Sequence, residues 1–169
     1  MSSFGQSSRS GRHNVSVKER TRFVLDTRLL DEGDRAAACR CVLTAVAEDI
    51  TTFETDIPWS AASEWPTDVS QAAELLSALK EPSSGEDQLY RRTGEVPRTN
   101  EDAWAAFITF APFAYDASTW GRESQQITAL ADAGESVVAA LTPEQAASVA
   151  SAIGAKTLVP LKQWRKRKR

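Results

Sequence analysis

Apolar residues recur at the spacing of an amphipathic helix in the segment from Arg35 to Ile50. The bulkier apolar side chains there are Cys39, Val42, Leu43, Val46 and Ile50. Residues three and four positions apart lie on the same side of a helix, so this spacing builds one apolar stripe. The preceding turn, residues 31–34, supplies an N-cap and places carboxylates where the helix dipole favours them. The pattern predicts a helix that begins at this turn.

Two further helices are predicted mainly from their ends. A capping-box pattern at Asp68 opens a helix that ends before Pro82. Asn100 caps a third helix. Because Pro112 removes a backbone hydrogen bond and crowds the preceding turn, we expect that helix to stop or kink near Phe110.

A fourth helix is predicted after a turn around Asp116 to Gly121. The apolar residues that follow the turn again keep a helical spacing: Ile127, Leu130, Ala131, Val138 and Leu141. Gly134 lies on the same stripe and weakens this helix by about 1 kcal/mol relative to alanine.

The strongest local signal begins a fifth helix. Thr142 stands at the N-cap, Pro143 at the first helical position and Gln145 at the third, so together they satisfy or delete the orphan amides of a helix start. Gly154 closes the helix. The predicted range is 143–153.

The remaining segments are expected to be extended or looped. Residues 20–25 alternate like a strand, and residues 155–161 favour an extended edge segment. Prolines make residues 51–65 extended or looped, and residues 82–100 form a long connection with a short hairpin around Leu89 and Tyr90. We therefore expect a mainly α-helical single domain of five helices with flexible basic termini. An α+β fold is the alternative, and it requires that the two extended segments pair.

Charge is segregated along the 169 residues, although the net charge is only −3. Residues 1–28 contain six basic and two acidic residues, and residues 162–169 contain six basic residues and no acid. Between them, residues 29–161 contain eight basic and 21 acidic residues. This pattern divides the chain into a polar basic tail (1–19), an acidic helical domain (20–161) and a basic C-terminal tail (162–169). The acidic body repels nucleic acid, whereas the ends attract it.

The start of the chain has two interpretations. Residues 1–18 are rich in serine and contain no acid, which is typical of an organelle transit peptide in a eukaryote and equally of a disordered tail. No apolar run is long enough to span a membrane, and the start lacks the apolar stretch of a secretory signal. We expect an intracellular and most simply cytoplasmic protein.

The basic C-terminus is the first candidate binding site. It combines an aromatic residue with a dense run of cations: Trp164, Arg165, Lys166, Arg167, Lys168 and Arg169. Such a run neutralises phosphates of RNA or DNA without choosing a sequence. The competing interpretation is a solvated tail, or an import signal if the source is a eukaryote.

Two other groups of residues are candidate sites. Trp59 and Trp65, each beside a proline, would form a partner-binding loop if exposed, although tryptophans more often fill a core. Arg91, Arg92 and Arg98 would form an anion site if they converged on one ligand, although a solvated basic loop is the favoured interpretation.

The sequence offers no catalytic constellation. The single histidine, His13, lies in the N-terminal tail, and Gly-rich phosphate loops are absent. Cys39 and Cys41 lack partners for a four-ligand zinc site, and the carboxylates of Glu54 and Asp56 lack further ligands at a recognisable spacing. We therefore expect no enzyme activity, no cofactor and no metal.

The preferred hypothesis is a non-enzymatic protein that binds a macromolecule. Its acidic helical face would recognise a protein partner, as an inhibitor, an immunity-type protein or an assembly subunit. The alternative is a nucleic-acid-associated or nucleocapsid-type subunit that contacts phosphate through its basic termini. The sequence leaves the oligomeric state open.

Overall fold

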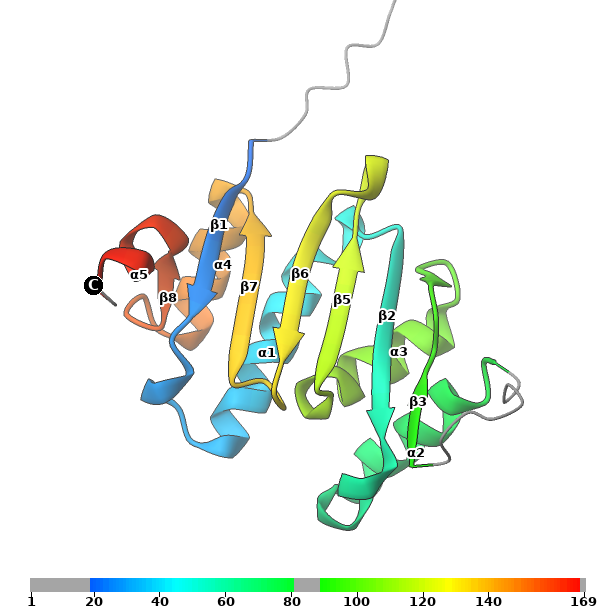
Figure 1. The fold of residues 1–169 in the computed structure, drawn as a ribbon. Helices are drawn as coiled ribbons and strands as arrows, with labels where there is room; N and C mark the ends of the chain where they lie inside the picture. Colours follow the sequence, from blue (N-terminus) through cyan, green and yellow to red (C-terminus); the bar gives the residue numbers. More distant parts are fainter. Residues whose placement is uncertain (1–18, 81–88, 168–169) are drawn as a thin grey trace, which may run out of the picture.

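A single antiparallel sheet organises the molecule (Figure 1). The computed structural model describes residues 19–80 and 89–167, and these contain eight strands: β1 (Thr21–Leu25), β2 (Thr52–Pro58), β3 (Tyr90–Arg92), β4 (Val96–Pro97), β5 (Asp116–Trp120), β6 (Gln126–Ala131), β7 (Ser136–Leu141) and β8 (Leu158–Pro160). Their order in the sheet is β3-β2-β5-β6-β7-β1-β8, and β4 pairs with β2. Every pairing is antiparallel.

Helices cover one face of this sheet (Figure 1). They are α1 (Glu32–Val46), α2 (Thr67–Ser77), α3 (Glu101–Phe110) and α4 (Pro143–Ile153), and a further helix, α5 (Leu161–Arg167), packs beside β1 and β8. Short 3₁₀ turns η1 to η5 lie at Thr27–Leu29, Ala47–Asp49, Trp59–Glu64, Ala111–Phe113 and Arg122–Ser124. Helix α1 packs against both α4 and α3, and α3 packs against α2. Helices on one side of an antiparallel sheet define a two-layer α+β fold.

The core lies between the helices and the sheet. In one row across the strands Phe53 pairs with Thr119, Thr119 with Thr128, and Thr128 with Ala139. The two threonines are almost completely buried, and their hydroxyl groups hydrogen-bond each other at 2.8 Å. Because each hydroxyl has a partner, these polar side chains do not carry the cost of an unsatisfied buried group. On the helical side the ring of Phe107 lies 4.6 Å from that of Phe53, between centroids.

The prediction of a mainly α-helical, five-helix domain is wrong. Residues 127–141, predicted as the fourth helix, form the β6–β7 hairpin, in which Leu130 pairs with Val137. The turn contains residues in the left-handed region: Asp132, Ala133 and Gly134 have φ values of 54°, 53° and 75°. Gly134 therefore marks a turn rather than a weak point in a helix.

The segment Asp116–Trp120 also differs from its prediction. It was expected to be a turn, and it forms the strand β5 between β2 and β6. Its buried residues are small or β-branched, namely Ala117, Ser118 and Thr119, so it carries no obvious apolar pattern. A strand can be built from such residues because its neighbours supply the bulky core side chains.

The predicted extended segments at 20–25 and 155–161 do pair, as β1 and β8. This is the condition set for the α+β alternative, although the sheet is far larger than two short segments. At the C-terminus, residues 161–167 form helix α5 instead of belonging to a flexible tail. The expectations for residues 1–18, the N-terminal tail or transit peptide, fall outside the described residues.

The capping signals located three helices well. Asp31 and Asn100 accept hydrogen bonds from the backbone N–H groups of Asp34 and Ala103 at the starts of α1 and α3, and Thr142 begins α4 with a complete capping box. Helix α2 instead begins at Thr67 after Pro66, without a side-chain cap.

Within residues 19–80 and 89–167, no helix combines the length and the apolar character needed to cross a membrane.

Candidate functional site

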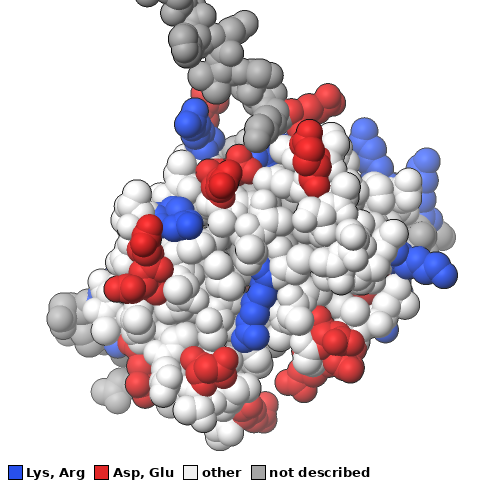
Figure 2. All heavy atoms as spheres, turned by 180° about the vertical axis from the view of Figure 1, so that it is seen from behind, with Lys and Arg blue, Asp and Glu red and all other residues white. Residues whose placement is uncertain are grey.

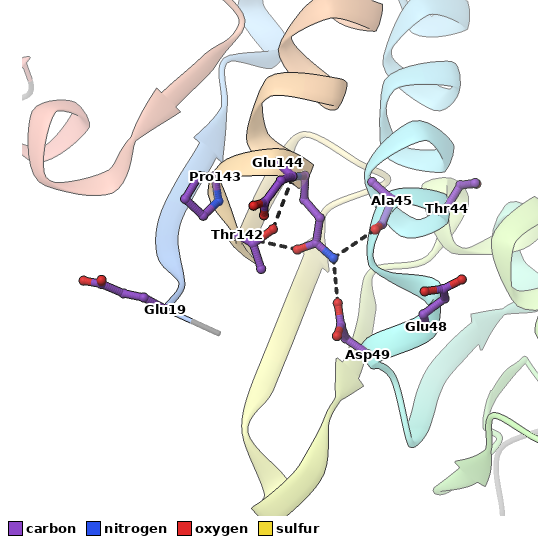
Figure 3. A pocket seen from close by; sticks show the side chains of 9 residues that line it. Glu19, Thr44, Ala45, Glu48, Asp49, Thr142, Pro143 and Glu144 are labelled. Carbon is purple, nitrogen blue, oxygen red and sulfur yellow. Dashed lines mark hydrogen bonds between the residues drawn. The ribbon is translucent and has the colours of Figure 1, made fainter. Parts of the chain in front are cut away.

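A cleft of about 610 Å³ opens where the end of α1 meets the start of α4 (Figure 3). Residues before β1, at the α1–η2 junction and at the N-terminus of α4 line it: Glu19, Thr44, Ala45, Glu48, Asp49, Thr142, Pro143, Glu144 and Gln145. Four of these nine residues are acidic and none is basic. The cleft therefore collects carboxylates from three separate segments of the chain.

Gln145 joins the two helices at this cleft. Its Oε1 accepts a hydrogen bond from the backbone N–H of Thr142 at 3.0 Å, which completes the capping box of α4. Its Nε2 donates to the carbonyl oxygen of Ala45 at 3.0 Å and to Oδ2 of Asp49 at 2.6 Å. One amide side chain thus caps α4 and also fixes the end of α1 against it.

Arg20 forms an ion pair with the same carboxylate. Its Nη2 is 2.7 Å from Oδ2 of Asp49, and its Nη1 donates to Oε1 of Gln145 at 3.1 Å and to the carbonyl oxygen of Ala140 at 2.9 Å. The Arg20 side chain is 8% exposed and that of Asp49 is 24% exposed. Charge-assisted hydrogen bonds of this kind fix both orientation and position, so Asp49 is held in place by two partners.

The other three carboxylates form the rim. Glu19, Glu48 and Glu144 are exposed, and Glu19 and Glu48 stand on opposite sides of the opening, with Asp49 and Thr142 between them (Figure 3). Neighbouring carboxylates in a partly enclosed site repel one another and attract a cation. This geometry suits a lysine or arginine side chain offered by another molecule.

Acidic residues also predominate on the helical side as a whole. Helices α1 to α4 and η2 contain just two basic residues, Arg35 and Arg40, against a larger acidic set: Glu32, Asp34, Glu48, Asp49, Asp68, Glu74, Glu101, Asp102 and Glu144. Figure 2 views this side and shows the carboxylates in several separate groups with uncharged surface and some cations between them. The cleft is thus one of several acidic groups on a surface of mixed charge, and the acidic groups do not join into one continuous acidic surface.

The two tryptophans of the predicted partner-binding loop pack on each other and against the core. The ring centroids of Trp59 and Trp65 lie 5.7 Å apart. Trp65 also makes an edge-to-face contact with Phe110, with 5.1 Å between the ring centroids. Both tryptophans are half-buried against the core. Both rings therefore pack against the core and stay partly exposed, and their role in binding a partner stays a prediction.

The three arginines of the predicted anion site point to different partners. Arg91 donates to the carbonyl oxygen of Lys80. Arg92 pairs with Asp116 at 2.8 Å and with Glu54 at 3.4 Å. Arg98 lies over the ring of Trp104, with 4.8 Å between the guanidinium carbon and the ring centroid. The structure does not bring the three together around one anion.

The predicted polyanion site at the C-terminus is divided. Trp164, Arg165, Lys166 and Arg167 belong to α5, whereas Lys168 and Arg169 lie outside the described residues. The ring of Trp164 is half-buried and is covered by the guanidinium group of Arg28 at 4.8 Å. Arg165 and Lys166 are exposed.

The carboxylates and thiols that were weighed as metal ligands or reactive groups have structural roles or are buried. Asp56 is fully buried, and its Oδ1 accepts hydrogen bonds from the backbone N–H groups of Tyr115 and Asp116. Burial raises the pKa of the Cys39 thiol to about 12, and Cys39 and Cys41 are not joined by a disulfide. Across the described residues, no three His, Cys, Asp or Glu side chains gather in a way that would hold a metal ion.

No family model, curated protein or solved structure matches this chain. The class that the geometry defines is a two-layer α+β protein with an acidic interhelical cleft. Sequence reasoning did not find this cleft. It identified Gln145 as a capping residue, but nothing in the sequence links that residue to Arg20 and Asp49.

Proposed function

We propose that this chain is a non-enzymatic binding protein that recognises a protein partner through its acidic helical side. In this proposal it acts as an inhibitor, an immunity-type protein or an assembly subunit. The observation that carries the proposal is the cleft between α1 and α4, where Glu19, Glu48, Asp49 and Glu144 surround an opening of about 610 Å³. The partner would insert a lysine or arginine side chain.

The position of Asp49 supports this proposal. Arg20 compensates its charge and, together with Gln145, fixes its carboxylate, so Asp49 gives the cleft a preorganised shape while Glu19 and Glu48 supply charge for a partner's cation. The exposed rim carboxylates Glu19 and Glu48 would speed association with a basic surface and disfavour acidic competitors. The fixed and the exposed carboxylates therefore contribute to different stages of binding.

The proposed setting is the inside of the cell, most simply the cytoplasm. Cys39 and Cys41 form no disulfide with each other, which suits a reducing compartment. Import into an organelle is the alternative if the source is eukaryotic.

The test compares two charge-reversed variants in capture from a nuclease-treated extract of the native cell. E19K/E48K changes the rim of the cleft, whereas E64K/E74K changes two exposed carboxylates on η3 and α2 and alters the net charge equally. The captured protein is then purified, and its affinity is measured by titration calorimetry.

We expect E19K/E48K to weaken binding by at least about 10-fold, because like charges at an interface cost more than about 1.4 kcal/mol. The control variant should bind like the wild type. Equal affinity of the two variants for the captured protein would exclude the cleft as the binding site. Far-UV circular dichroism of both variants checks that they are folded.

The nucleic-acid-associated or nucleocapsid-type subunit is the second candidate function. Helix α5 favours it, because it carries the basic C-terminal sequence as an exposed structural element. The two candidate functions use different parts of the surface, so each can be tested with the other site intact.

A further inference from the structure

Helix α5 presents its basic side chains on one exposed face. Lys162, Arg165 and Lys166 stand three and four positions apart, a spacing that places them on the same side of a helix. All three are exposed, whereas Leu161 and Trp164 are half-buried. Helix α5 contacts β1 and β8 and lies at that edge of the sheet, far from α2 and β3 (Figure 1).

Arg28 extends this basic surface from a neighbouring segment. Its Nε and Nη2 each donate to one carboxylate oxygen of Asp26 at 2.9 Å, and Asp26 itself is buried. Its guanidinium carbon lies 4.8 Å from the centroid of the Trp164 ring, yet the Arg28 side chain is 70% exposed. Asp26 and Trp164 therefore hold the guanidinium group of Arg28 beside α5, and much of the Arg28 side chain stays accessible to solvent.

The packing of α5 distinguishes between kinds of polyanion. An amphipathic helix that binds a membrane buries its apolar side in lipid, but Leu161 and Trp164 are already packed on the protein. A platform for single-stranded nucleic acid stacks bases on aromatic rings, but the ring of Trp164 is covered by Arg28. What is left for contact is a set of cations, and cations recognise phosphates.

We propose that the exposed face of α5, with Arg28, contacts the phosphate backbone of a nucleic acid duplex without reading its base sequence. The inference deepens the second candidate function and rests on it. Side chains three and four residues apart on a helix are about 5–6 Å apart at Cβ, and duplex DNA carries one phosphate per about 3.4 Å of axis on each strand. The three cations of α5 can thus reach successive phosphates.

The test measures binding of a fluorescently labelled duplex of about 20 base pairs across a range of about 50–200 mM salt. The variant R165Q/K166Q removes two cations from α5. The matched control K80Q/R122Q removes two exposed cations that lie elsewhere on the surface. Fluorescence anisotropy gives the slope of the logarithm of the binding constant against the logarithm of salt concentration, and thermal unfolding checks the fold of each variant.

We expect the magnitude of the slope to fall by about 1.8 in R165Q/K166Q, since each lost phosphate contact lowers it by about 0.9. The control should keep the wild-type slope, and two duplexes of unrelated sequence should bind equally. If the wild type binds duplex but R165Q/K166Q keeps its slope, α5 is not the contact, and the second candidate function then relies on other cations.

Two further results would overturn the proposal. Absence of duplex binding by the wild type at the lowest salt would overturn it, and if a labelled single strand is not bound either, the second candidate function is lost as well. Binding to vesicles that contain phosphatidylserine, lost in R165Q/K166Q and without any duplex binding, would assign the basic face to a membrane.

Discussion

Replacing Arg20 by methionine tests the network behind the acidic cleft. The methionine side chain retains much of the aliphatic volume, but it removes the donors to Ala140, Gln145 and Asp49. Because Arg20 is 8% exposed, water replaces these bonds poorly. The substitution should therefore lower the stability of the fold as well as release Asp49.

The expected loss is about 2–3 kcal/mol. Removing one partner of a fully buried ion pair costs about 3–5 kcal/mol. Asp49 is 24% exposed and keeps its hydrogen bond from Gln145, so its carboxylate regains part of its hydration and the cost is smaller. For a domain of this size that loss lowers the thermal midpoint by roughly 4–12 °C.

Urea unfolding followed by circular dichroism measures the change in the free energy of unfolding. The exposed Arg122 provides the control, since R122M should stay within about 0.5 kcal/mol of the wild type. A double-mutant cycle with D49N should give a coupling energy of about 1 kcal/mol or more. If R20M unfolds like R122M, or if R20M and D49N are additive, the network does not fix the cleft as described.

Two more predictions concern the turn of the β6–β7 hairpin and the core. A Cβ at Gly134 would lie 3.2 Å from both Cys39 Sγ and the Pro112 carbonyl oxygen at a φ of +75°, so G134A should lose about 2 kcal/mol or more in urea unfolding. G94A, where φ is +66° and no atom lies within 4 Å, should lose about 1 kcal/mol; equal losses would contradict the close packing. Burial raises the pKa of Cys39 from 9.0 to about 12, so above pH 9 the unfolded chain loses a proton that the folded chain keeps. Stability should fall by about 1.4 kcal/mol at pH 10 from this thiol alone, and C39A should show a shallower fall; identical pH profiles would refute the assignment.

Helix ends were predictable because their signals are local. The hydrogen bonds of the caps at Asn100 and Thr142 join residues three positions apart, so the sequence contains the whole interaction. The range predicted for the helix that became α4, 143–153, agrees with the structure. A capping residue needs no tertiary partner to be recognised.

The β6–β7 hairpin was not predictable from spacing alone. Residues 127, 130, 131, 138 and 141 fit a helical stripe, but the buried positions on β7 include Val137, Ala139 and Leu141, which alternate. The decisive feature is the turn between the strands, where Asp132 and Ala133 adopt positive φ values without being glycine. Asp132 followed two positions later by Gly134 is a turn signal, and giving it more weight would have favoured two strands over one helix.

The acidic cleft depends on tertiary structure in the same way. Gln145 meets Arg20 and Asp49 only because β1 lies beside β7 and α1 lies beside α4. Each residue has an ordinary local explanation: Gln145 as a cap, Arg20 as part of the predicted extended segment 20–25, and Asp49 as an acid near a helix end. Their combination appears once the fold is known.

The place of β1 in the sheet has a consequence for the order of assembly. Strand β1 is made before the other described strands, yet its two neighbours, β7 and β8, are the last two of those strands to be made. Strands β5, β6 and β7 can pair as they emerge, whereas β1 waits for partners that have not been synthesised. Contacts so distant in sequence slow folding, and β1 stays unpaired in the nascent chain until β7 has been made and can pair with it.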